Sequence, residues 1–157
     1  MKMKEEDHAR LLLPGCRNTV IASYLEKKMT DFQDGGLLLD MDVTLPSGLS
    51  VTNPDLICIF GNLLNNAQEA CELLQGAVIR LSVSYREPYL RIVCTNPLAA
   101  KADTPAEEKK NRRIPELDRG IGHSILRTMA ERYDGQFCAE TVDRTYEAEL
   151  ILKTRKE

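Results

Sequence analysis

Apolar residues recur at the three- and four-residue spacing of an amphipathic helix in three parts of the chain. The first part follows Asn18 and Thr19, either of which can cap a helix, and it stops at a glycine pair. The second follows Pro54, and proline is favoured in the first helical turn because it has no amide hydrogen to satisfy. The pattern predicts three helices, over residues 19–34, about 55–74 and 123–133.

Apolar and polar residues alternate in five shorter segments, as they do in strands with one buried face. In the first segment, Leu39, Met41 and Val43 fall on one side, and the residues between them are aspartates. The predicted strands cover residues 37–45, 77–85, 89–95, 136–141 and 145–153. This order of elements predicts an α+β fold, in which helices cover one face of a mixed, mainly antiparallel sheet.

Residues 97–119 break the pattern. Eleven charged side chains, six basic and five acidic, lie between Lys101 and Arg119, together with two prolines. Loops of about 20 residues are uncommon inside small domains, and those that occur are usually functional or disordered. We expect a mobile loop here, inside one domain that covers residues 16–157 after a lead-in over residues 1–15.

Composition narrows the class of protein. The 157 residues suffice for one domain, and a net charge of −3 argues against binding nucleic acid through overall positive charge. No apolar run approaches the roughly 20 residues that cross a bilayer, and the first residues lack the apolar core of a secretion signal. The five cysteines never form a CxxC pair, so we expect reduced thiols in a cytosolic domain.

Asparagines crowd the predicted central helix. Asn62 and Asn66 are four residues apart and share a face, with Glu69 near it, although the asparagine amide competes with a helical backbone. An amide oxygen is a neutral, hard ligand that suits Mg²⁺ when water and phosphate oxygens fill its other positions. A polar face turned to solvent explains the same residues, and helix physics alone leaves both explanations open.

Two further segments could contact a ligand. The third helix opens with Arg119, Gly120, Ile121 and Gly122, and glycines let a backbone approach a phosphate that helix N-terminal amides attract. Asn96 stands at the end of a predicted strand, where its side chain could hydrogen-bond a base. Taken alone, each segment is also compatible with an ordinary loop end or turn.

Together these segments resemble a known family. The GHKL ATP-binding superfamily has an N box that residues 62–70, NLLNNAQEA, resemble, and a glycine-rich G box that residues 119–135, RGIGHSILRTMAERYDG, resemble. Between the boxes, a hairpin, a strand end and a variable lid (residues 97–119) follow in the family's order. Over residues 16–153 the chain looks like the catalytic domain of sensor histidine kinases, nearest to the Agr-type peptide-sensing subgroup. The resemblance implies the Bergerat fold, a two-layer α/β sandwich.

The resemblance also implies roles for single residues, with ATP and Mg²⁺ as cofactors. Asn66 would ligate the Mg²⁺ that bridges to the phosphates, and Asn62 would support the same phosphate and metal geometry. The segment from Arg119 through Gly120 and Ile121 to Gly122 would lie beside the phosphates. Asn96 would stand where most of these kinases carry an aspartate that accepts a hydrogen bond from the adenine amino group.

The chain departs from the family at several positions. It has no DxGxG motif, which supports the base in other members, and His123 follows the glycines where leucine is usual. Glu69 stands where many kinases have a basic residue. Hydrolytic members of the superfamily commonly carry glutamate at the position of Asn62, and an amide cannot activate water. His8 lies too close to the N box to leave room for dimerisation helices, so we expect no phosphoacceptor histidine in this chain.

These observations predict a domain that positions Mg·ATP for phosphoryl transfer to a histidine on a dimerisation segment outside this chain. Its expected partners are ATP, that segment of the same parent kinase and, indirectly, a response regulator. We expect no nucleic acid partner, and no membrane contact by this cytoplasmic part of a membrane-anchored parent. Two alternatives remain: a degenerate GHKL interaction module, which the missing DxGxG motif favours, and a GHKL-type ATPase, which Asn62 disfavours.

Overall fold

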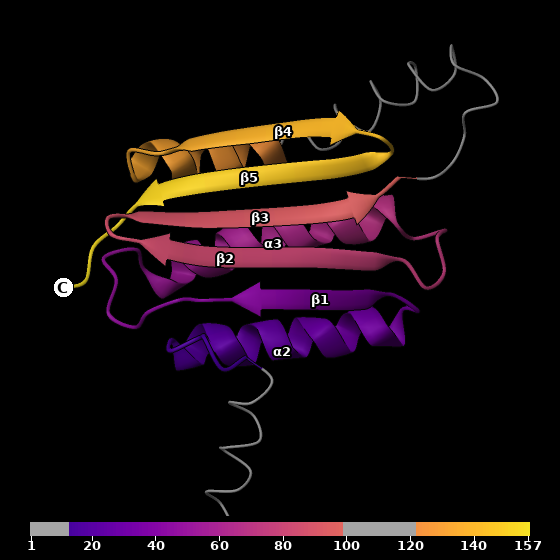
Figure 1. The fold of residues 1–157 in the computed structure, drawn as a ribbon, viewed down its shortest axis with the longest axis horizontal. Coiled ribbons are helices and arrows are strands. Elements are labelled where there is room, and N and C mark those ends of the chain that lie inside the picture. The colour runs from indigo at the N-terminus through magenta and orange to yellow at the C-terminus, as the bar shows by residue number, and fades with distance from the viewer. Residues whose placement is uncertain (1–12, 99–121) are drawn as a thin grey trace, which may run out of the picture.

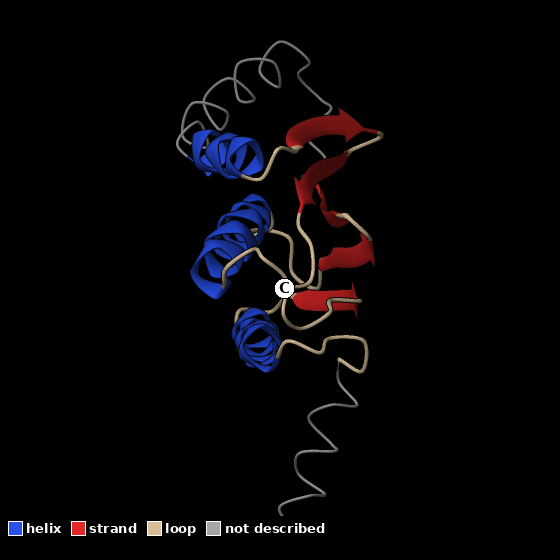
Figure 2. Ribbon diagram, turned by 90° about the vertical axis from the view of Figure 1, so that its left-hand side faces the viewer, coloured by secondary structure: helices blue, strands red, loops and turns tan. Residues whose placement is uncertain are grey.

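Three helices lie against one face of a five-stranded sheet in the computed structural model, which describes residues 13–98 and 122–157 (Figures 1 and 2). The helices are α2 (Thr19–Asp34), α3 (Asn53–Ala70) and a helix over residues 122–132. The strands are β1 (Leu38–Val43), β2 (Val78–Arg86), β3 (Tyr89–Pro97), β4 (Gln136–Val142) and β5 (Thr145–Lys153). The predicted order of helices and strands is confirmed. None of the described helices is apolar over a length that would cross a membrane.

The sheet is mixed and mainly antiparallel, as predicted. Its strand order is β1-β2-β3-β5-β4, with β1 parallel to β2 and every other neighbouring pair antiparallel. The middle strand, β3, pairs with β2 on one side and with β5 on the other, and in the second pairing Asn96 stands opposite Tyr146. The helix over residues 122–132 lies behind β4 and β5, and α3 lies behind the middle of the sheet (Figure 1).

Capping side chains set where α2 and α3 begin. Oδ1 of Asn18 accepts a hydrogen bond from an amide of the first turn of α2 at 3.1 Å, and Oγ1 of Thr52 accepts one from the Asp55 amide at 3.3 Å. Nδ2 of Asn18 also donates to Oδ1 of Asn53 at 2.8 Å. This last bond joins the starts of the two helices. Because the Asn18 side chain accepts from the first turn of α2, Asn18 rather than Thr19 is its cap.

The N-box helix, α3, ends earlier than its apolar pattern indicated. It stops at Ala70 with Cys71 as its C-cap, and turns replace the helical turn predicted as far as Leu74. The Gly76 amide donates to the Gly36 carbonyl at 2.8 Å, which ties this turn to the one that follows α2. Leu74 packs against the core from the turn, and this burial explains why its spacing resembled a helix.

The core is mainly aliphatic, in keeping with the low aromatic content of the chain. The largest fully buried side chains are Phe32 and Phe60, and those that follow are isoleucines and leucines from both layers. None of the five cysteines forms a disulfide, as predicted, and burial raises the pKa of the Cys94 thiol to about 12. A thiol held neutral by burial behaves as a small hydrophobic side chain.

Gly135 stands where the chain passes from the helix over residues 122–132 into β4, directly against β5. A Cβ atom on Gly135 would lie 1.7 Å from the carbonyl oxygen of Ile151, a backbone atom of β5. We therefore predict that Gly135→Ala lowers the free energy of unfolding by about 3 kcal/mol or more, because the backbone of β5 has to move. Urea unfolding followed by circular dichroism measures this loss.

Gly35→Ala is the matched control. A Cβ atom on Gly35 would make only an ordinary contact, 3.5 Å from the Phe32 carbonyl oxygen. We expect its unfolding free energy to change by less than about 1 kcal/mol. Equal losses for the two variants would contradict the steric explanation.

Candidate functional site

Two asparagine side chains lie on one face of α3. Nδ2 of Asn62 donates to the carbonyl oxygen of Cys58, one turn earlier, at 2.7 Å. This bond partly offsets the destabilising effect of an asparagine inside a helix. It uses the nitrogen of the amide and not the oxygen. Asn66, one turn later, is half-buried like Asn62. The face therefore offers amide oxygens that the helix itself does not use.

The helix over residues 122–132 starts beside these amides. A Cβ atom built on Gly122 would lie 3.5 Å from Oδ1 of Asn62, and 3.4 Å and 3.5 Å from Nδ2 and Oδ1 of Asn66. The two segments that the sequence singled out separately are thus neighbours in the fold. With only a hydrogen atom at this position, Gly122 leaves the space between its backbone and the two amides open.

The third asparagine of the motif has a different environment. Asn65 is exposed, and its Oδ1 accepts a hydrogen bond from Nζ of Lys28 on α2 at 3.4 Å. The explanation of a solvated polar face therefore fits Asn65, whereas Asn62 and Asn66 face Gly122. This difference makes Asn65 a natural control position for the other two.

Asn96 is one of the few buried polar residues in the described part of the chain. It lies one residue before the end of β3, is 2% exposed, and donates from Nδ2 to the Pro97 carbonyl at 2.9 Å. Its Oδ1 receives no hydrogen bond from a described residue, and no fully buried side-chain oxygen there lacks a partner. The amide oxygen of an asparagine is a hydrogen-bond acceptor, as the recognition of an amino group requires.

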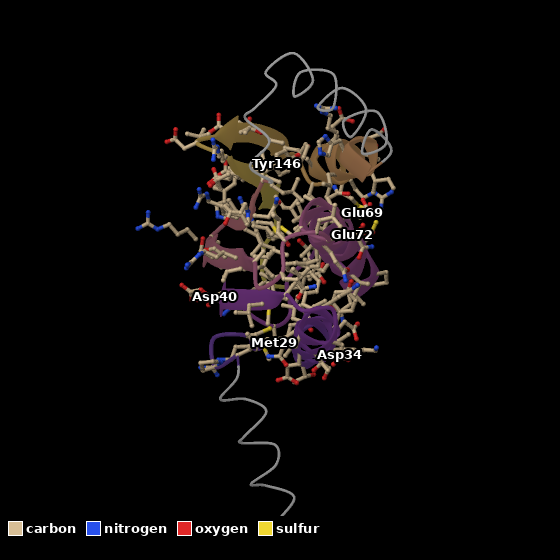
Figure 3. The ribbon with its side chains drawn as sticks, turned by 90° about the vertical axis from the view of Figure 1, so that its right-hand side faces the viewer. Met29, Asp34, Asp40, Glu69, Glu72 and Tyr146 are labelled. Atoms are coloured by element: carbon tan, nitrogen blue, oxygen red, sulfur yellow. The ribbon has the colours of Figure 1, made fainter. Side chains whose placement is uncertain are left out.

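Several predicted residues lie outside the described ranges. These are Arg119, Gly120, Ile121, His8 and all but the first two residues of the lid. The structure accordingly places Asn62, Asn66, Asn96 and Gly122. Figure 3 views the end of the molecule where β3 ends: Tyr146 lies on the sheet side, and Glu69 and Glu72 lie on the side of α3. Glu69 is exposed there.

A cluster around Asp55 joins the far end of the helix over residues 122–132 to the start of α3. The Tyr133 hydroxyl donates to Oδ2 of Asp55, and the Arg132 guanidinium donates to Oδ1 at 3.0 Å. The Thr52 amide donates to the same hydroxyl at 3.4 Å. The bond from Tyr133, and then the interactions with Arg132, hold the pKa of Asp55 below its ordinary value. The two helices are thus in contact at both ends, by this cluster and at Gly122.

The amide oxygens of Asn62 and Asn66 are donor atoms that suit Mg²⁺ bound together with a nucleotide. No group of three or more His, Cys, Asp or Glu side chains in residues 13–98 and 122–157 could hold a metal ion. Mg²⁺ binds through few protein ligands, keeps several waters and takes phosphate oxygens readily. The amide oxygens beside Gly122 therefore fit this ion as part of a nucleotide complex rather than as a separate metal centre.

A hollow of about 450 Å³ lies at the opposite end of the sheet and contains none of these residues. Its lining comes from the start of the described chain, the segment after β1 and the residues after β5: Pro14, Gly15, Arg17, Thr44, Pro46, Ser47 and Lys156. The chemistry at the end of β3 is therefore separate from it.

Comparison with known families assigns the class. A family model described as GHKL domain matches residues 52–153, from the start of α3 to the end of β5. The chain belongs to the GHKL domain family. No sequence among the curated proteins matches it.

Solved histidine kinase structures share the fold. A histidine kinase from Burkholderia phymatum matches with a TM-score of 0.61 and 16% identity over 82% of this chain and 66% of its own. Full-length ShkA in complex with AMPPNP matches with a TM-score of 0.61 and 16% identity over 84% of this chain and 28% of its own. The nucleotide-free catalytic domain of ThkA matches with a TM-score of 0.55 and 14% identity over 82% of this chain and 91% of its own. This chain thus spans about two thirds of the first structure, just over a quarter of the second and most of the third.

The Asp55 cluster predicts a pH-dependent stability. Asp55→Asn should lower the free energy of unfolding by about 1–2 kcal/mol at neutral pH, because hydrogen bonds to a charged group are lost. Since the pKa of Asp55 is lowered by folding, its contribution is complete above the ordinary carboxyl pKa, near 4, and is lost as the pH falls through the folded-state pKa. Urea unfolding at several pH values should show a constant difference between the two proteins above about pH 5, and a shrinking difference below about pH 4.

Asp40→Asn is the control for this series. Asp40 pairs with Arg80 at 3.1 Å on the open face of the sheet, where both side chains are exposed. Such pairs contribute little, so we expect a loss below about 0.5 kcal/mol. A difference for Asp55→Asn that persisted unchanged at pH 3 would show that ionisation of Asp55 does not contribute.

Proposed function

We propose that this chain is the ATP-binding catalytic domain of a sensor histidine kinase. The observation that carries the proposal is the approach of Gly122 to Asn62 and Asn66, which brings an amide-rich helix face and a glycine-opened helix together. Membership of the GHKL family, and the fold shared with histidine kinase catalytic domains, support it. ShkA, which shares the fold, was solved with AMPPNP, and this supports ATP as the ligand.

Each described site residue has a proposed task. Oδ1 of Asn66 would ligate Mg²⁺, and Oδ1 of Asn62 would support the same metal and phosphate geometry. Gly122, following Arg119, Gly120 and Ile121 in the chain, would let the backbone approach the phosphates. Oδ1 of Asn96 would accept from the amino group of adenine. Bound Mg²⁺ would neutralise phosphate charge, so these residues bind and orient.

The residues favour transfer over hydrolysis. Asn62 cannot take a proton from water, because an amide has no basic lone pair at neutral pH. We propose that the acceptor histidine lies on a dimerisation segment of the same parent kinase, and that a response regulator receives the phosphoryl group afterwards. His123 is a poor acceptor, since its Nε2 is hydrogen-bonded to the Tyr146 hydroxyl at 2.7 Å.

We extend the proposal to the parent protein on the sequence of the N box. The segment NLLNNAQEA resembles the Agr-type peptide-sensing kinases, so we propose a membrane-anchored parent with this domain in the cytoplasm.

Asn66→Ala tests the site. We expect the dissociation constant for Mg·ATP to rise about ten- to a hundredfold, as the loss of one ligand to a charged group predicts. Isothermal titration calorimetry with and without Mg²⁺ measures this, and the unsubstituted chain should bind ATP more tightly with the metal. The fold should persist, since the side chain is only half-buried and alanine favours a helix.

Asn65→Ala is the matched control on the same helix. Its side chain faces Lys28 on α2 and not Gly122, so the affinity for Mg·ATP should remain that of the unsubstituted chain. If Asn66→Ala bound Mg·ATP as tightly as Asn65→Ala, the metal site would be misplaced. No binding of millimolar ATP by the unsubstituted chain would favour a degenerate GHKL module instead.

Labelled ATP tests the division between binding and transfer. The chain alone should bind ATP, hydrolyse it very slowly and acquire no label, because transfer needs an acceptor nitrogen in line with the γ-phosphate. Addition of a fragment that supplies the dimerisation helices of the parent kinase should give an acid-labile label on that fragment. Acid-labile label on the chain alone would contradict the placement of the acceptor, and His8 would then be the first residue to substitute.

A further inference from the structure

A hydrogen-bonded ring pair fixes the first turn of the helix over residues 122–132 to the sheet. Nε2 of His123 and the Tyr146 hydroxyl are 2.7 Å apart, and the two rings are nearly parallel, with an interplanar angle of 6° and centroids 6.3 Å apart. His123 also meets the Phe137 ring at 5.3 Å, and the Arg127 guanidinium lies 5.9 Å from the same ring. One turn of the helix is thereby attached to both β4 and β5.

The ring pair lies between the two halves of the proposed site. His123 directly follows Gly122, which faces Asn62 and Asn66. Tyr146 stands opposite Asn96 in the pairing of β5 with β3, and the alternation of both strands puts the two side chains on the helix side of the sheet. These contacts and this strand pairing link the amides of α3, through Gly122, His123 and Tyr146, to Asn96.

Two apolar side chains anchor this helix in the core independently of the pair. Leu126 and Ala130, on the same helix, are fully or almost fully buried in the core. His123 and Tyr146 are only half-buried, at the end of the molecule where β3 ends. The bond between His123 and Tyr146 restricts the position of Gly122, the residue before His123.

We propose that His123 and Tyr146 are positioning residues of the nucleotide site, an inference that rests on the proposed function. Their bond holds Gly122 at a fixed distance from the sheet, and so fixes the phosphate end of the site relative to Asn96. Glycine has the largest backbone freedom to lose, and a link that restricts it before the ligand arrives lowers the entropic cost of binding. When the bond is removed, Gly122 has to be ordered on binding, so Mg·ATP binds more weakly.

Tyr146→Phe removes the hydroxyl and keeps the ring. We expect calorimetry on the full chain to give a dissociation constant for Mg·ATP that is about five- to tenfold higher, the effect of one hydrogen bond. Tyr85→Phe is the matched control, because the Tyr85 hydroxyl donates to the Thr154 carbonyl at 2.9 Å at the other end of the sheet. Its urea midpoint should fall at least as far as that of Tyr146→Phe, with no change in affinity.

A double-substitution cycle separates positioning from general damage. His123→Leu should weaken Mg·ATP binding to a similar extent, and the double variant should bind no more weakly than either single one, because both changes break the same link. Equal affinities for Tyr146→Phe and the unsubstituted chain, additive losses, or an equal loss for Tyr85→Phe would overturn this inference alone. An unsubstituted chain that does not bind Mg·ATP would overturn it together with the proposed function.

Discussion

The close approach between the helix over residues 122–132 and α3 is the constraint on which the site depends. Gly122 can face Asn62 and Asn66 only if the later helix lies beside α3 in one register. The Asp55 cluster sets that register at the far end, where Tyr133 and Arg132 bind one carboxylate. Buried Leu126 and Ala130 fill the space between the two ends. The sheet then adds Asn96 from the opposite layer, so that three elements converge.

Local patterns predicted the parts of this arrangement that depend on periodicity. Alternation located all five strands, and the four-residue spacing of Asn62 and Asn66 put them on one face of a helix. The predicted end of α3 was wrong because Leu74, which is partly buried, packs against the core from a turn. An apolar stripe indicates which residues are buried, and not that they are helical. The meeting of Asn66 with Gly122 was suggested by the family resemblance, and no local pattern contains it.

Contacts between distant segments could not be predicted from the sequence, for a physical reason. An aspartate in a first helical turn is ordinary, since it complements the helix dipole, so Asp55 gave no sign of its partner Tyr133. Tyr146 meets His123 and stands opposite Asn96 only because β5 pairs with β3 in one particular register. The strand pattern alone does not specify that register. His123 was noticed as a departure from the family, but its partner could not be inferred.

The position of β3 in the middle of the sheet has a consequence for how the two halves of the site respond to fluctuations. Asn96 lies on the middle strand, which pairs with β2 as far as Thr95 and with β5 at Asn96 itself, so its backbone is held by the sheet. Gly122 begins a helix that packs on the sheet through one face. We therefore expect native-state opening to affect the two halves of the proposed site unequally: the proposed base end keeps its shape through small fluctuations, and the proposed phosphate end absorbs them.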